Sequence, residues 1–224
     1  MKKYILLPLI FMMLAKYGAA QMGAIKGSGK IVSKTFNYKN FDKIFIKDFD
    51  GNVEIENGEA YAISISIDDN LEKLLAISEE GGELKITLNN NLNNKLYLEN
   101  TNIKVKISLP NLSQIKQEGN NKTIVNNITA NKFVVKCSGN GDLICSGITN
   151  NVKIVSNGNG NVNTKKLISK NASVTKTGNG NIYINTKNKF MVKSTGNGDV
   201  VNVGEGKASE ESVVEGNGEI IIEN

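Results

Sequence analysis

The chain of 224 residues contains no histidine, no tryptophan and no arginine. Without histidine it has no imidazole to act as a base near neutral pH or to bind a metal. Without arginine it lacks the planar fork that holds phosphates and base edges through paired hydrogen bonds, so we expect no nucleic-acid binding. These absences argue against several large classes of enzyme and nucleic-acid-binding protein before any motif is considered.

Cysteine is also scarce, with Cys137 and Cys145 alone in the whole chain. They lie eight residues apart, on either side of a glycine-rich turn, and both fall on positions that the strand pattern described below directs inward. Two interpretations stay open: a disulfide within one repeat, which export would permit, or a pair of buried thiols that pack as small apolar side chains. Nucleophilic catalysis by either thiol is not expected, because no histidine is present to act as its base.

The first 20 residues have the three parts of a secretory signal peptide. Lys2 and Lys3 give a basic start, residues 4–15 are apolar, and residues 18–20 are the small residues Gly-Ala-Ala. The apolar run is too short for the ~30 Å hydrocarbon core of a bilayer, so we expect cleavage, export and a mature chain without a transmembrane segment. Cleavage removes three lysines and no acid, which lowers the formal net charge from +5 to +2.

Glycine and asparagine are abundant, and they recur at a regular interval. The triplet Gly-Asn-Gly occurs five times, and an altered copy, Gly-Asn-Asn at 119–121, precedes the first. The first residues of successive copies are 20, 19, 20, 18 and 20 residues apart, which is typical of a repeat architecture. The five triplets consist of Gly139, Asn140, Gly141, Gly158, Asn159, Gly160, Gly178, Asn179, Gly180, Gly196, Asn197, Gly198, Gly216, Asn217 and Gly218.

Apolar and polar side chains alternate on both sides of each triplet. This period of two is typical of strands with one buried face, so each repeat is interpreted as strand, tight turn, strand and looser turn. A unit of about 20 residues is too small to bury a core alone, and stacking such units ~4.8 Å apart pairs every strand with its counterparts in the neighbouring repeats. The pattern predicts an all-β fold, a single-stranded right-handed β-helix or solenoid with ~20-residue coils.

The triplets are predicted to be structural turns. Glycine and asparagine tolerate positive φ, and asparagines in register can join in a hydrogen-bonded ladder. Calcium binding is the competing interpretation, because Asp142 and Asp199 follow triplets, as in calcium-binding glycine-rich repeats. Those repeats recur about every nine residues and the interval here is twice as long, so we expect no metal and no cofactor.

Residues before the first triplet are also rich in predicted strands but lack the repeat. Residues 69–75 are predicted to form a capped helical turn, residues 80–83 a hairpin turn, and residues 89–94 an exposed loop. Alternating segments, each typical of a half-buried strand, occur at 45–47, 53–55, 62–67, 84–88 and 103–109.

The domain boundaries follow from these patterns. No linker separates the irregular part from the repeats, so we expect one domain. The expected organisation is a signal peptide at 1–20, a leader at 21–35 and a single domain over 36–224, irregular over 36–118 and regularly repeated over 119–224.

Several motifs occur in a fixed order along the chain. They are Phe41-Asp42-Lys43-Ile44, Asp50-Gly51-Asn52-Val53-Glu54-Ile55, Asp68-Asp69-Asn70-Leu71, Leu84-Lys85-Ile86, Val105 to Leu109-Pro110 and the recurring Gly-x-Gly-Asp/Asn. Together they resemble the GIN domain family, labelled "putative auto-transporter adhesin head", across residues 36–222. Members of that family more often carry Gly-Ser-Gly-Asp where this chain has Gly-Asn-Gly. The resemblance implies a secreted right-handed β-helix and assigns no activity and no functional residue.

Paired carboxylates need attention, because some right-handed β-helices cleave acidic polysaccharides. Asp199 and Glu219 follow triplets of adjacent repeats, so they are expected ~5 Å apart, a separation that suits a glycosidase pair. Nothing in the sequence is placed to raise the pKa of one acid while the other stays ionised. They are the weak candidates for catalysis, and the preferred interpretation is that they are solvated acids after a turn.

One outward column of the repeats is more apolar than a solvated face should be. The fifth residue after each first glycine gives Ile144, Tyr183, Val201 and Ile221, interrupted by Asn163. A contiguous apolar column on an outward face marks a covered surface or a partner. Three hypotheses follow: the column packs under the N-terminal half, it forms an interface between subunits in a homo-oligomer, or the alternation shifts at the turn so that the column does not face outward.

The expected function is that of an exported, non-enzymatic surface or periplasmic binding protein. A long face rich in asparagine, serine, threonine and lysine suits an extended partner such as a glycan or another surface macromolecule. Two alternatives remain: a polysaccharide-active β-helix of the pectinase type, and a purely structural envelope protein.

Overall fold

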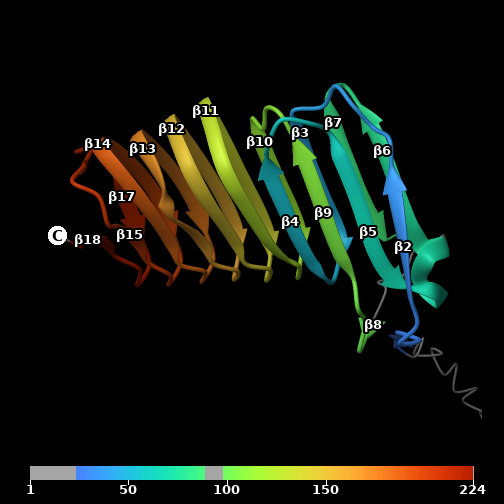
Figure 1. Ribbon diagram of the computed structural model, residues 1–224. Coiled ribbons are helices and arrows are strands. Elements are labelled where there is room, and N and C mark those ends of the chain that lie inside the picture. Colours follow the sequence, from blue (N-terminus) through green and yellow to red (C-terminus); the bar gives the residue numbers. More distant parts are fainter. Residues whose placement is uncertain (1–23, 89–97, 224) are drawn as a thin grey trace, which may run out of the picture.

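The structure, a computed structural model, describes residues 24–88 and 98–223 and is built almost entirely of β-strands (Figure 1). The expected signal peptide at 1–20 and the expected loop at 89–94 lie outside the described residues. The N-terminal elements are β1 (Ile25–Lys26), β2 (Ile31–Phe36), β3 (Lys43–Phe49), β4 (Asn52–Asn57), β5 (Ala62–Asp68), the 3-10 helix η1 (Asp69–Leu74), β6 (Leu75–Glu80), β7 (Glu83–Leu88), β8 (Leu98–Glu99) and β9 (Lys104–Leu109).

The remaining strands belong to the repeats. They are β10 (Gln114–Gly119), β11 (Lys122–Gly139), β12 (Leu143–Gly158), β13 (Val162–Thr177), β14 (Ile182–Thr195), β15 (Val200–Asn202), β16 (Lys207–Ala208), β17 (Val213–Glu215) and β18 (Ile220–Ile222). None of the helical structure in the described ranges has the length and hydrophobicity that a bilayer crossing requires.

Successive repeats pair in parallel and in register. β10 pairs with β11, and the long strands β11 to β14 pair in sequence, which Figure 1 shows as a row of neighbouring ribbons. Gly119 lies opposite Gly139, and Gly139 lies opposite Gly158, so each pairing joins residues one repeat apart. The triplets therefore lie over one another at one edge of the stack, as their spacing predicts.

The core lies inside the stack, at alternate positions of every strand. Val135, Ile154, Val174 and Val192 stand four residues before a triplet, and all are fully buried. Their counterparts four residues after the first glycine are buried too, from Leu143 in β12 to Val200 in β15. Full burial of such a side chain stabilises the fold by roughly 1.5–3 kcal/mol, so each repeat stabilises its neighbours.

The N-terminal half continues the same stack. β3 pairs in parallel with β10, and β4 pairs in parallel with β11, although more than sixty residues separate the partners in sequence. β7 then pairs with β3, and β9 with β4, again in parallel. The predicted strands at 45–47, 53–55, 62–67, 84–88 and 103–109 correspond to β3, β4, β5, β7 and β9, the last of which begins one residue later than predicted.

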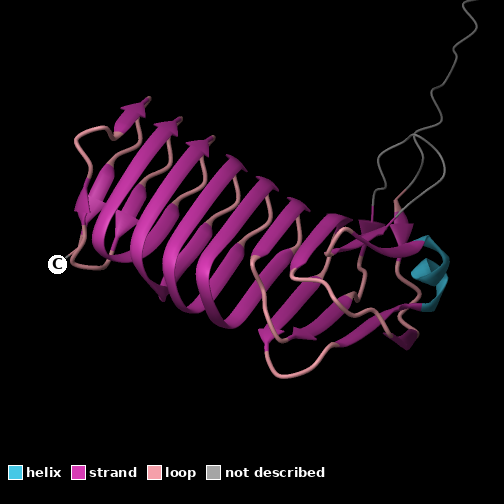
Figure 2. Cartoon of the chain, turned by 90° about the horizontal axis from the view of Figure 1, so that it is seen from above, coloured by secondary structure: helices cyan, strands magenta, loops and turns pink. Residues whose placement is uncertain are grey.

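Antiparallel strands end the stack on the N-terminal side. β5 pairs antiparallel with β9, β2 with β5, and β6 with β7. The predicted helical turn is confirmed as η1, and Figure 2 shows this helix at the far end of the row of strands. The predicted hairpin turn is confirmed between β6 and β7, where Gly81 and Gly82 both have positive φ. Residues 31–35, expected in the leader, belong in the structure to β2, which pairs with β5.

Candidate functional site

The Gly-Asn-Gly triplets form the corner of each repeat, and two reasons require their glycines. The first glycine adopts a left-handed backbone in most copies, for example φ +119° at Gly178. Neither glycine has room for a side chain, since a Cβ on Gly178 would overlap the carbonyl oxygen of Gly158, and a Cβ on Gly160 that of Gly141, each one repeat earlier. Sequence reasoning supplied the first reason and missed the second, which only the stacking distance reveals.

The predicted asparagine ladder is confirmed along this corner. Each central asparagine donates its side-chain amide to the side-chain carbonyl of the asparagine one repeat earlier. The Nδ2–Oδ1 distances are 3.3 Å for Asn140–Asn120, and 2.9 Å for Asn159–Asn140, Asn179–Asn159, Asn197–Asn179 and Asn217–Asn197. The asparagines therefore link the repeats to one another, which supports their interpretation as structural residues.

A second ladder runs through the residue that follows each triplet. The backbone N–H of Asn161 donates to Oδ1 of Asp142 at 2.8 Å, and that of Asn181 donates to Oδ1 of Asn161 at 2.9 Å. The same bond reaches Asp199 from Glu219, whose N–H lies 3.0 Å from Oδ1. Asp199 thus serves as a rung of this ladder. The signal was available in the sequence, because every residue at this position carries a side-chain oxygen.

The two cysteines lie inside the stack, as their position in the pattern predicts. Both are free thiols in the structure, so the disulfide stays a prediction. Burial away from water raises the pKa of Cys137 to about 12. Burial also raises the pKa of Cys145 well above its ordinary value, and the nearby Cys137 adds to this effect. Both groups are therefore neutral thiols near neutral pH, and neither is an activated nucleophile.

Lys176 occupies the same inward position as Cys137 and is 2% exposed. Its Nζ donates to the carbonyl oxygen of Gly178 at 2.8 Å. Burial lowers the pKa of Lys176 below its ordinary value of 10.5, while the negative charge of Asp199 opposes the shift. Sequence reasoning missed this residue. The signal was a lysine two residues before a triplet, where the alternation directs side chains inward.

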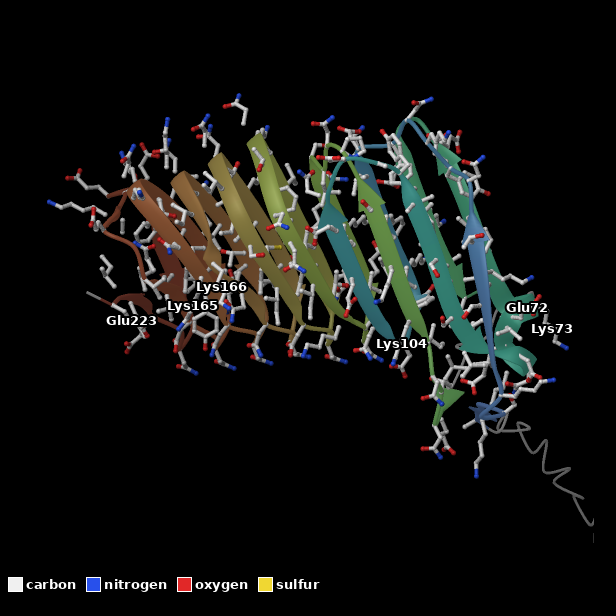
Figure 3. The ribbon with its side chains drawn as sticks, in the orientation of Figure 1. Glu72, Lys73, Lys104, Lys165, Lys166 and Glu223 are labelled. Atoms are coloured by element: carbon white, nitrogen blue, oxygen red, sulfur yellow. The ribbon has the colours of Figure 1, made fainter. Side chains whose placement is uncertain are left out.

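The side chains of the outward apolar column are less exposed to solvent than the sequence pattern predicts. Val201 is only 5% exposed, and Ile144, Tyr183 and Ile221 are half-buried. Nζ of Lys165 lies 4.5 Å from the centre of the Tyr183 ring and 3.6 Å from Oε2 of Glu223, so a lysine covers part of the column (Figure 3).

The hypothesis that the N-terminal half packs over this column is not supported. Glu54 of β4 lies opposite Ile124 of β11, and Ile124 lies opposite Ile144 of β12. β4 therefore lies next to the column in the same stack and does not cover it. No N-terminal strand of the described ranges makes extensive contacts with β13, β14 or β15. That the column forms an interface between subunits stays a prediction.

A polar pocket of about 400 Å³ lies beside the N-terminal end of the asparagine ladder. Asn120, the first rung, lies in its wall together with Asp50 and Lys122. Lys104 of β9, labelled in Figure 3, borders it as well. Amide, carboxylate and ammonium groups line most of this wall, which suits a hydroxylated ligand better than an apolar one.

The fold and these sites define a class of protein: all-β chains whose parallel strands stack in register, with carboxylates and amides joining the repeats. The chain belongs to the family described as "Putative auto-transporter adhesin, head GIN domain", which matches residues 40–206. The resemblance noted from the sequence is thereby confirmed. No curated protein matches the chain.

Solved structures share the fold at low sequence identity. A putative adhesin from Bacteroides fragilis NCTC 9343 is 17% identical, with 89% of this chain and 100% of that chain covered and a TM-score of 0.66. A putative lipid binding protein from Parabacteroides distasonis ATCC 8503 is 18% identical, with coverages of 90% and 100% and a TM-score of 0.56. A putative adhesin from Parabacteroides merdae ATCC 43184 is 16% identical, with coverages of 90% and 99% and a TM-score of 0.52. At these identities the likeness concerns the fold alone.

Proposed function

We propose that the protein is an exported, non-enzymatic, adhesin-like protein that binds a glycan or another surface macromolecule. The family description supports the adhesin-like part of this proposal. The signal peptide expected at residues 1–20 supports export to the periplasm, the outer-membrane surface or the medium.

The proposal includes the architecture that the repeats predict: a single domain whose coils form a right-handed β-solenoid. Parallel pairing between residues one repeat apart supports this architecture, as does the burial of alternate side chains. A stack of this kind offers long, rigid outward faces, on which side chains are held before a partner arrives. Such preorganisation lowers the entropic cost of binding.

The observation that carries the non-enzymatic part is the use made of Asp199. Oδ1 of Asp199 accepts the N–H of Glu219, as Asp142 accepts that of Asn161, so both acids repeat one structural bond. This bond accounts for Asp199 after its triplet without a catalytic role. Within the described residues, histidine, cysteine, aspartate and glutamate form no group of three or more that could hold a metal ion.

The experiment that tests the proposal follows binding and cleavage together. The purified mature protein is titrated with a panel of acidic and neutral polysaccharides, while new reducing ends are measured over a day. We expect binding of at least one polymer without new reducing ends. Release of reducing ends that is lost in Asp199→Asn with Glu219→Gln would establish the polysaccharide-active alternative. No binding and no cleavage would leave a purely structural role.

A further inference from the structure

One long face of the repeats carries lysines and no acid. The face is formed by the residues of β11 to β14 that precede each triplet and point outward, at sixteen positions: 132, 134, 136, 138, 151, 153, 155, 157, 171, 173, 175, 177, 189, 191, 193 and 195. Five of these are lysines, none is an aspartate or a glutamate, and none is buried. We call it the lysine face; its lysines are Lys132, Lys136, Lys153, Lys189 and Lys193.

The strand register fixes the arrangement of these lysines. Lys132 and Lys136 lie four residues apart on β11, about 13 Å along the strand. Three strands further on, Lys189 and Lys193 of β14 occupy the same two register positions, about 14 Å away across the stack. Lys153 of β12 lies between the two pairs. The face therefore presents a rigid rectangle of ammonium groups with one more inside it.

The positive charge of this face is a local feature. The described residues carry 23 lysines and 22 acids, which leaves a net charge of +1 for all of them together. The five lysines of the face have no carboxylate within 4.0 Å among the described residues, whereas Lys116 on the neighbouring β10 pairs with Glu118 at 2.7 Å. On the last repeat Glu215 lies opposite Thr195, and Lys207 lies opposite Lys189, so the part of the face without acids ends at β14.

We infer that the lysine face binds a linear polysaccharide that carries carboxylate groups, which gives the function proposed above its ligand class and its surface. Each ammonium group donates charge-assisted hydrogen bonds to a carboxylate. Eight of the other positions are asparagine, serine or threonine, whose amides and hydroxyls bind sugar hydroxyls between the charges. The flat face spans several sugar units, so many weak contacts add along one chain.

Other anionic partners fit this face less well. Nucleic acids are held through stacking of bases on aromatic side chains and through arginine forks, and the face has no aromatic residue and no arginine. An anionic bilayer is bound through a charged surface that also inserts apolar side chains. The three apolar residues here, Val134, Val155 and Met191, are half-buried in the sheet surface. A hydroxylated polyanion matches both the charges and the polar residues between them.

The test compares two triple variants of the mature protein by calorimetry with polygalacturonate. Lys136→Gln/Lys153→Gln/Lys193→Gln removes three charges from the lysine face. Lys104→Gln/Lys106→Gln/Lys122→Gln removes three from the strands that border the polar pocket. We expect the first variant to bind at least about tenfold more weakly and the second to bind within about twofold of the wild type, because each exposed ion pair contributes modestly and three act together. Unchanged melting temperatures show that both variants are folded.

Six outcomes support or overturn the inference. Loss in the first variant alone, with binding that weakens as salt is raised, supports the inference. Equally weakened binding in both variants overturns it in favour of net charge. Weakened binding in the second variant alone overturns it in favour of the pocket. Binding of neutral dextran with no binding of polygalacturonate overturns the inference while the proposed function stands; binding of no polymer at all overturns both. Equal affinity for single-stranded DNA overturns the choice of ligand class.

Discussion

The repeats and the N-terminal half bury similar cores by different routes. In the repeats, β11 to β14 make the same parallel contacts over and over, with glycine and asparagine at each corner. In the N-terminal half, parallel strands β3 and β4 give way to the antiparallel strands β2, β5 and β6 and to η1. A stack of identical units has no natural end, so the irregular half supplies one on its side.

The two ends of the stack differ in consequence. β2, β6 and η1 lie at the N-terminal end, where Figure 1 labels the two strands and Figure 2 shows the helix. At the other end the strands are short, and Val213 and Ile222 are 50% and 43% exposed. The regular repeats therefore stabilise one another through identical contacts, whereas the irregular half covers the N-terminal end of the stack.

The largest expected effect separates the corner glycines from the turn glycines of the N-terminal half. Gly160→Ala should lower the free energy of unfolding by about 3 kcal/mol, because its Cβ would overlap the backbone of Gly141. Gly81→Ala should cost only about 1 kcal/mol, since its φ of +59° is unfavourable but no atom lies within 4 Å of the new Cβ. Urea unfolding followed by circular dichroism measures both. Equal losses would mean that the repeats are not packed as tightly as described.

A smaller effect is expected along the asparagine ladder. Asn179→Ala removes one donated and one accepted hydrogen bond and should lower the free energy of unfolding by about 1.5 kcal/mol. Asn217→Ala, at the last rung, removes a single bond and should cost about half as much. Asn111→Ala in the N-terminal half is the control and should have almost no effect. Identical values for Asn179 and Asn111 would show that the ladder does not stabilise the stack.

Lys176→Met tests the effect of the buried charge. It should raise the free energy of unfolding at pH 7 by about 1 kcal/mol, because methionine has a similar length and carries no charge that burial must desolvate. Since the pKa of Lys176 is lowered in the folded protein, the unfolded chain binds more protons between that pKa and 10.5. Wild-type stability should therefore rise with pH across this window, and the advantage of the variant should shrink. Lys170→Met, at an exposed position, is the control. A gap that widens toward pH 10.5 would contradict the burial of the amine.

The smallest expected effect concerns the thiols in the native protein. With the pKa of Cys137 at about 12 and that of Cys145 raised as well, neither should react with iodoacetamide at pH 8 over several hours. Thr175→Cys places a thiol at an exposed position of β13 and should be labelled readily. In denaturant without reductant, two native thiols should be labelled. No labelling there, with a mass lower by two hydrogens, would establish the disulfide.

Much of the repeat region was predictable, because its information is local and recurs. The triplet interval placed the corners over one another, and the alternation identified Val135 and its counterparts as core. Lys176 occupies an inward position of the same alternation, but the alternation was traced through apolar residues, so it did not identify a buried lysine. The pairing of β3 with β10 was not predictable, since no local pattern states that Lys43 faces Gln114. The role of Asp199 required the position of the next repeat's backbone.

The asparagine corner has a directional consequence. Each side-chain amide from Asn140 to Asn197 donates toward the N-terminal end and accepts from the C-terminal side, while Asn217 only donates and Asn120 only accepts. Rotating one amide by a half turn would bring two carbonyl groups together on one side and two NH₂ groups on the other, so one rung cannot reverse alone. All the amides of the row therefore have the same orientation, and their small dipoles add along the length of the stack.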